Sequence, residues 1–112
     1  MKKLLLILLV STSVFTFAQQ TDKETYIKKE SVGGKLDFTK RIEEKYKDAP
    51  FIKFGDTLFN KKDFAILLWA ANVRTAGIES LDVTEKLWEE INKRNLSDAE
   101  KKALKTGFEA KF

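Results

Sequence analysis

The chain has 112 residues, no cysteine and no histidine, and 21 Lys+Arg residues against 17 Asp+Glu residues. Without these two residue types it forms no disulfide bond, holds no typical zinc site, and has neither a thiol nucleophile nor an imidazole base for catalysis. The remaining oxygen ligands suit calcium or magnesium, but the spaced Asp/Asn, Gly and Glu pattern of a calcium-binding loop does not occur. We therefore predict no metal and no cofactor.

The first 18 residues have the three parts of a Sec-type signal peptide. Lys2 and Lys3 precede an apolar run over residues 4–10, and Thr16 and Ala18 occupy the small-residue positions before a cleavage site. The run is shorter than the ~20 apolar residues of a membrane-spanning helix, and no cysteine is present to carry a lipid. We predict that residues 1–18 are removed, and that the mature chain starts near Gln19. It would work in the periplasm or outside the cell, without a stable membrane anchor.

Removal of the signal peptide also changes the charge balance. It would take away Lys2 and Lys3 and leave 19 basic against 17 acidic residues. So small a positive excess does not support a nucleic-acid partner, and none is predicted.

Residues 19–35 are mostly polar, with Tyr26, Ile27 and Val32 as their large apolar residues. We predict a flexible lead-in here, which could include a short strand around Tyr26. Two glycines, Gly33 and Gly34, separate it from the folded part, which is predicted as a single helical domain over residues 36–112.

The first two elements of this domain are a helix and a hairpin. Asp37 is an acceptable N-cap for a helix up to Lys47, which the approach to Pro50 ends. Residues 51–60 alternate in the manner of a β-hairpin that turns at residues 55–57, with Gly55 at the start of the turn. A lone hairpin is marginally stable in water, so it must pack on the helices.

The central element is a helix over about residues 61–76, which contains the apolar run AILLWAA. Asn60 is its predicted N-cap and Gly77 its stop. Because its apolar residues cover nearly the whole circumference, the helix is predicted to be the buried centre of the domain.

Two further helices complete the predicted fold. Asp82 with Glu85 and Ser97 with Glu100 have the spacing of capping boxes at the starts of these helices. The fold class is therefore mainly α, a small four-helix domain with a β-hairpin insert and a central buried helix.

Catalysis finds little support in the sequence. The serines of the mature chain stand in no Ser-x-x-Lys arrangement, and Glu85 and Glu89 lie on the same face of one helix. We predict that the protein is not an enzyme. A carboxylate-based hydrolase remains the second alternative, and it needs two acids that face each other across a cleft.

Two sets of residues are candidates for binding. Aromatic residues are preferred in cores and in interface hot spots, and those that could contact a partner are Phe51, Phe54, Phe59, Trp69 and Trp88. Basic residues that could hold an anion near the start of the central helix are Lys53, Lys61 and Lys62; they could equally serve solubility alone.

These observations favour a small exported, non-enzymatic binding protein that acts on another envelope or secreted protein, such as an inhibitor or an immunity-type protein. The first alternative is a carrier of a small apolar or anionic ligand. An open apolar patch favours the protein partner, and an enclosed cavity beside Trp69 favours the carrier.

Overall fold

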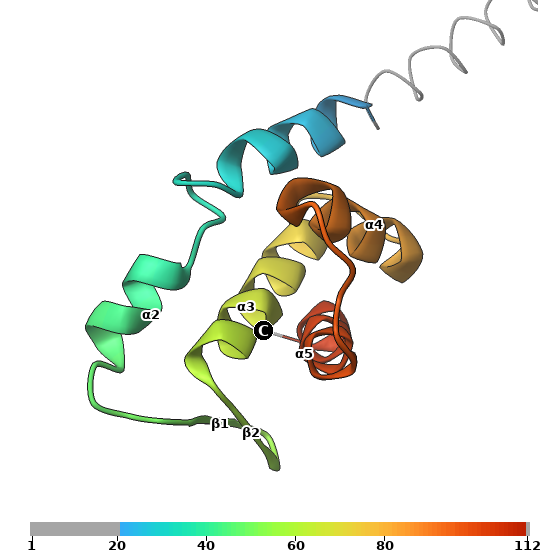
Figure 1. Ribbon diagram of the computed structural model, residues 1–112. Helices are drawn as coiled ribbons and strands as arrows, with labels where there is room; N and C mark the ends of the chain where they lie inside the picture. The colour runs from blue at the N-terminus through green and yellow to red at the C-terminus, as the bar shows by residue number, and fades with distance from the viewer. Residues whose placement is uncertain (1–20, 112) are drawn as a thin grey trace, which may run out of the picture.

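The computed structural model describes residues 21–111, so the predicted signal peptide and Gln19 lie outside the described residues, as does Phe112. The described part contains a helix over residues 21–30 and four others: α2 (Thr39–Lys45), α3 (Lys61–Thr75), α4 (Leu81–Asn92) and α5 (Asp98–Glu109). Two short strands, β1 (Ile52–Phe54) and β2 (Thr57–Phe59), lie between α2 and α3 (Figure 1). The predicted mainly α fold with a β-hairpin is confirmed.

Helix α3 is the centre of the structure, as its all-round apolar sequence predicted. Its first turn is capped by Asn60, whose side chain accepts a hydrogen bond from the Asp63 backbone N–H at 2.7 Å. It ends before Gly77, which has a φ of +115° that favours glycine. Seven of its residues are buried: Phe64, Ile66, Leu67, Trp69, Ala70, Ala71 and Val73.

Two groups of buried residues share α3. The larger joins it to the helix over residues 21–30 and to α4 and α5, through residues that include Ile27, Trp69, Trp88, Leu104 and Phe108. The smaller joins it to α2, the hairpin and α5, and comprises Ile42, Ile52, Phe59, Phe64, Leu67 and Ala103. Opposite sides of one helix therefore organise the whole described part of the chain.

Helices α3 and α5 make the closest helix contact. A Cβ atom added to Gly107 of α5 would lie 1.9 Å from the backbone oxygen of Leu67 and 2.6 Å from its carbonyl carbon. Only a residue without a side chain allows the two backbones to approach this closely.

The prediction that a short strand could form around Tyr26 is wrong, because residues 21–30 are helical. Tyr26 is exposed, whereas Ile27 is completely buried among the residues of the larger core. The core therefore begins at Ile27, nine positions before the predicted domain start at Leu36. This helix has no periodic apolar face, and it packs on the larger core through the single buried side chain of Ile27.

The other elements follow the prediction with local differences. Helix α2 begins at Thr39 and ends at Lys45, two residues before the predicted end. The hairpin pairs Ile52 with Phe59 in antiparallel register, and Thr57 belongs to β2 rather than to the turn. The hairpin turn starts at Gly55, whose φ is +61°.

The predicted helix starts were right at α3 and α5 and wrong at α2 and α4. The N-cap of α2 is Phe38, without a side-chain cap, rather than the predicted Asp37. The capping box of Ser97 and Glu100 is present at α5. The box of Asp82 and Glu85 is wrong, because Ser80 caps α4 by accepting from the Val83 backbone N–H at 3.3 Å. Starting two residues earlier places Leu81 inside the helix, where it packs on the larger core.

Ser31, which follows the helix over residues 21–30, links this part of the chain to α3 by a hydrogen bond. The Trp69 Nε1–H donates to the Ser31 hydroxyl at 2.8 Å, and that hydroxyl donates to the Ile27 carbonyl.

Replacement of Ser31 by alanine should lower the free energy of unfolding by about 1–2 kcal/mol, because it leaves the indole N–H without this acceptor. It should also shift the Trp69 indole signal in a nitrogen-15 NMR spectrum. Thr25→Ala, which removes an exposed hydroxyl in the preceding helix, is the control, and an unmoved Trp69 signal in Ser31→Ala would contradict the contact.

Candidate functional site

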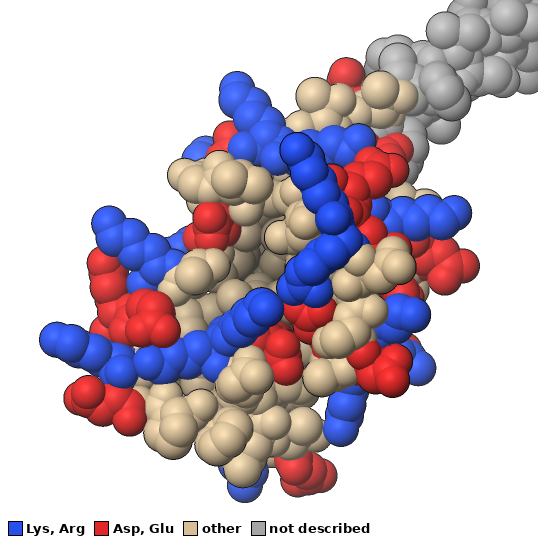
Figure 2. All heavy atoms as spheres, viewed as in Figure 1, with Lys and Arg blue, Asp and Glu red and all other residues tan. Residues whose placement is uncertain are grey.

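A groove of about 280 Å³ lies on the face of α3 that points away from α5. Its sides are formed by residues 31–39, by α2 and by the end of α4. Figure 2 shows it as a hollow with uncharged residues at its floor and with both basic and acidic side chains around its mouth. The floor residues are Leu36, Phe38, Ile66, Trp69, Trp88 and Ile91.

Two tryptophans from different helices meet the groove. Trp69 of α3 and Trp88 of α4 are both buried core residues that also line the groove. Each is fixed by a polar contact, because the Trp69 indole bonds to Ser31 and the Arg94 guanidinium stacks over the Trp88 ring at 4.7 Å. The two tryptophans of the floor are thus held in place by contacts within the protein before any ligand arrives.

One wall of the groove is a loop. Val32, which lines this wall, has 71% of its surface exposed. Gly33 follows with a φ of +73°, and its N–H donates to the Asp37 carboxylate at 2.9 Å. The loop therefore carries an exposed apolar side chain at the edge of an apolar groove, which is the kind of surface that marks a binding site.

Charged residues surround the groove mouth in pairs. Lys61 Nζ lies 3.3 Å from the Glu43 carboxylate and donates to the Lys47 carbonyl at 2.9 Å. Arg94 donates to both oxygens of Glu100, at 2.7 and 2.6 Å. Lys62 differs, since its Nζ is 4.0 Å from Glu100 and its side chain is 73% exposed.

The Arg94–Glu100 pair is the strongest electrostatic feature of the site. Only 5% of the Glu100 side chain is exposed, and its carboxylate also accepts from the Ser97 backbone N–H at 2.9 Å. The bidentate bond from Arg94 and then the bonds from Ser97 lower the pKa of Glu100 to about 2. Sequence reasoning found Glu100 as a helix cap and missed Arg94, because the two residues meet across a loop that includes Lys93 in a left-handed conformation.

The predicted aromatic contacts divide between core and surface. Phe59 is buried in the smaller core, Phe54 is half-buried, and Phe51 is exposed. Phe51 does not line the groove, and neither does the exposed Leu58 on β2. The two tryptophans are the predicted partner residues that the groove brings together.

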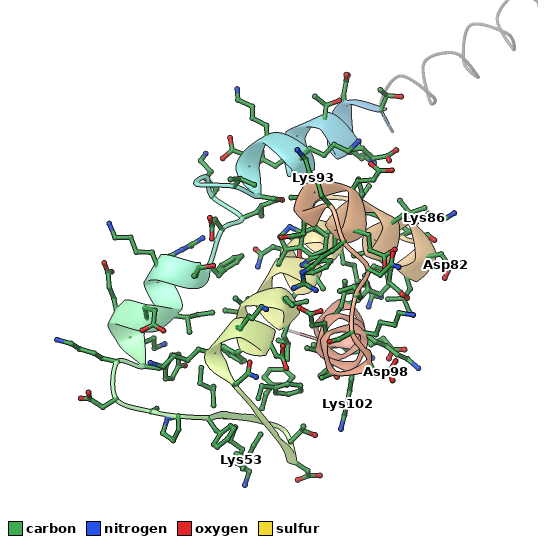
Figure 3. All side chains as sticks on the ribbon, in the orientation of Figure 1. Lys53, Asp82, Lys86, Lys93, Asp98 and Lys102 are labelled. Atoms are coloured by element: carbon green, nitrogen blue, oxygen red, sulfur yellow. The ribbon has the colours of Figure 1, made fainter. Side chains whose placement is uncertain are left out.

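The three predicted anion residues are not brought together. Lys61 and Lys62 both line the groove, whereas Lys53 lies on β1 outside it, at the hairpin end of the molecule (Figure 3). Lys61 is occupied by Glu43 and a backbone carbonyl. Lys62 is therefore the lysine of this set best placed to meet an incoming anion.

Two carboxylates, Asp37 and Glu43, line the groove, which is the minimum that a carboxylate-based hydrolase needs. Glu43 pairs with Lys61, and Asp37 accepts from backbone N–H groups. Those bonds, the one from Gly33 first, lower the pKa of Asp37. A general acid needs a raised pKa, so this arrangement does not favour the hydrolase alternative.

Among residues 21–111, no three or more acidic residues gather in a way that could hold a metal ion. None of the helices described there combines the length and the hydrophobicity that a membrane crossing requires.

Comparison with protein-family models, with curated proteins and with solved structures gave no match. The groove is the feature of the described residues that suggests a function, through its apolar floor, its exposed loop wall and the paired charges around its mouth.

Proposed function

We propose that the protein is a small exported, non-enzymatic binding protein that acts on another envelope or secreted protein through the groove. The observation that supports this most is the open apolar groove itself, which the exposed Val32 lines together with Trp69 and Trp88. Interface hot spots are typically aromatic-lined pockets that receive one large side chain of the partner. An inhibitor or immunity-type role fits the small size and the predicted export.

The open mouth of the groove, rather than its volume, favours a partner side chain over a carried small molecule. Pockets for small ligands usually have volumes of roughly 300–1,000 Å³ and bury most of the ligand. The groove has about 280 Å³, near the lower end of this range, and is open at its mouth. Because a cavity of about 150 Å³ holds benzene, one benzene-sized side chain would fill about half of this space. The carrier alternative needs an enclosed cavity, and the groove offers an open one.

The proposal is tested by placing the same charge inside and outside the groove. Val32→Asp should weaken partner binding by about tenfold or more, because a carboxylate would be desolvated against the apolar contact. Leu58→Asp is the matched control, since Leu58 is 62% exposed on the hairpin and does not line the groove. Both positions are exposed, so both variants should keep the stability of the unmodified protein within about 0.5 kcal/mol.

The measurement is affinity capture of envelope and secreted fractions on the tagged exported protein and on each variant, followed by titration of the captured partner. A partner retained by Leu58→Asp and lost by Val32→Asp would support the proposal. A partner lost only by Leu58→Asp would place binding on the hairpin and contradict it, as would the absence of any stoichiometric partner.

A further inference from the structure

We infer that the partner segment recognised by the groove carries a carboxylate within about three residues of its apolar anchor, and that Lys62 receives this carboxylate. The inference rests on the proposed function and adds the chemistry of the partner to it. It is based on the partners of each charged residue at the mouth of the groove.

The charges at the groove mouth are paired, and the pair of Lys62 is the weakest of them. Glu43 is matched by Lys61, and Arg94 is matched by Glu100. Asp37 has its own donors in the backbone N–H groups of Gly33 and Thr39, at 2.9 and 3.2 Å.

Arg41 also belongs to this balance. It donates to backbone carbonyls, including that of Asp37, and its positive charge is among the causes that lower the pKa of Asp37. Lys62 itself faces two acids, Glu100 at 4.0 Å and the neighbouring Asp63, whose pKa the charge of Lys62 lowers although burial raises it.

Lys62 is nevertheless the cation of the groove that a partner can reach most easily. Its ion pair with Glu100 is long, at 4.0 Å, and Glu100 already holds Arg94 through both of its oxygens. The Lys62 side chain is 73% exposed, so a partner carboxylate could reach the ammonium without displacing another protein group. An accessible lysine beside an apolar floor favours partners of complementary charge.

The spacing along α3 sets how far the carboxylate can be from the anchor. Lys62, Ile66 and Trp69 fall at positions i, i+4 and i+7, so they follow one stripe of the helix. All three line the groove. The rise of 1.5 Å per residue puts about 10 Å between the ends of this stripe, which an extended peptide covers in about three residues.

The test is selection of random 12-residue peptides displayed on phage against the folded protein. Selected peptides should share a large apolar residue with Asp or Glu within about three positions of it. Selection against Lys62→Glu should lose this preference and favour Lys or Arg at the same distance. Lys53→Glu, which makes the same charge change on the hairpin outside the groove, should select the same peptides as the unmodified protein.

Affinity measurements on one selected peptide quantify the contact. Replacing its acid by the matching amide should weaken binding to the unmodified protein about threefold, as expected for a partly exposed ion pair. The same replacement should have no effect on binding to Lys62→Gln, because the pair is already broken there.

Two results would overturn the inference in different ways. If the selected peptides no longer bind to Val32→Asp but show no preference for an acid, Lys62 does not have the inferred role and the proposed function still holds. Peptides whose binding is unchanged in Val32→Asp would place recognition outside the groove, and both the inference and the proposed function would fail.

Discussion

Replacement of Gly107 by alanine should lower the free energy of unfolding by about 3 kcal/mol, the upper end of the usual range for overpacking. The new Cβ would lie 1.9 Å from the Leu67 carbonyl oxygen, and the neighbouring atoms at 2.6 and 2.9 Å also belong to the Leu67 backbone. No side chain can rotate away to relieve this contact, so α3 and α5 must move apart. Helix propensity alone predicts the opposite sign, since alanine stabilises a helix by about 1 kcal/mol relative to glycine.

Urea unfolding followed by tryptophan fluorescence measures this effect. Thr106→Ala, one position earlier in α5, is the control and should change stability by less than about 0.5 kcal/mol. A Gly107→Ala variant as stable as the unmodified protein, or more stable, would show that the two helices do not approach as closely as described.

The buried carboxylate of Glu100 should make stability depend on acidity in a defined range. Its pKa is lowered from an ordinary 4.5 to about 2 in the folded protein, because Arg94 and Ser97 bond to the charged form. The unfolded chain therefore takes up this proton first, and the stabilisation that is present above about pH 4.5 is lost as the pH falls towards 2. With Arg94 partly exposed, we expect the contribution at neutral pH to be about 2 kcal/mol.

The stability difference between the unmodified protein and Glu100→Gln isolates this carboxylate. It should be about 2 kcal/mol at pH 6 and should shrink towards zero near pH 2. Asp63 contributes with the opposite sign, since burial and the charge of Glu100 raise its pKa. Glu100→Gln removes the second cause, so the difference also contains a smaller change at Asp63. The exposed Glu44→Gln serves as control, and a difference for Glu100→Gln that stays constant with pH would contradict the role of the ion pair.

Local signals in the sequence were sufficient where the structure is determined locally. Asn60 before α3, Gly77 after it, and the Ser97–Glu100 box act on backbone groups a few residues away, so their patterns could be recognised directly. The start of α4 failed because Ser80 and Asp82 both suit an N-cap. The choice between them depends on the burial of Leu81 in a core that the sequence does not display.

The groove could not be predicted, because its parts come from segments far apart in the chain. Trp69 and Trp88 were candidates for their residue type, yet nothing in the sequence indicated that Val32 would complete a wall beside them. Ile27 was assigned to a polar lead-in for the same reason, since one buried side chain leaves no periodic pattern. Arg94 and Glu100 are six positions apart and meet only because the chain turns between two helices.

Both sides of the groove are ordered before a partner binds. Trp69 stands on the side of α3 that faces away from the close contact of Leu67 with Gly107, so a packed helix pair supports the floor from behind. The loop wall is held by Ser31, which accepts from the Trp69 indole, and by the backbone N–H groups of Leu36 and Asp37, which donate to the carbonyls of Glu30 and Gly34. Binding would therefore remove little conformational entropy from the chain, and most of the free energy of the apolar contact would appear as affinity.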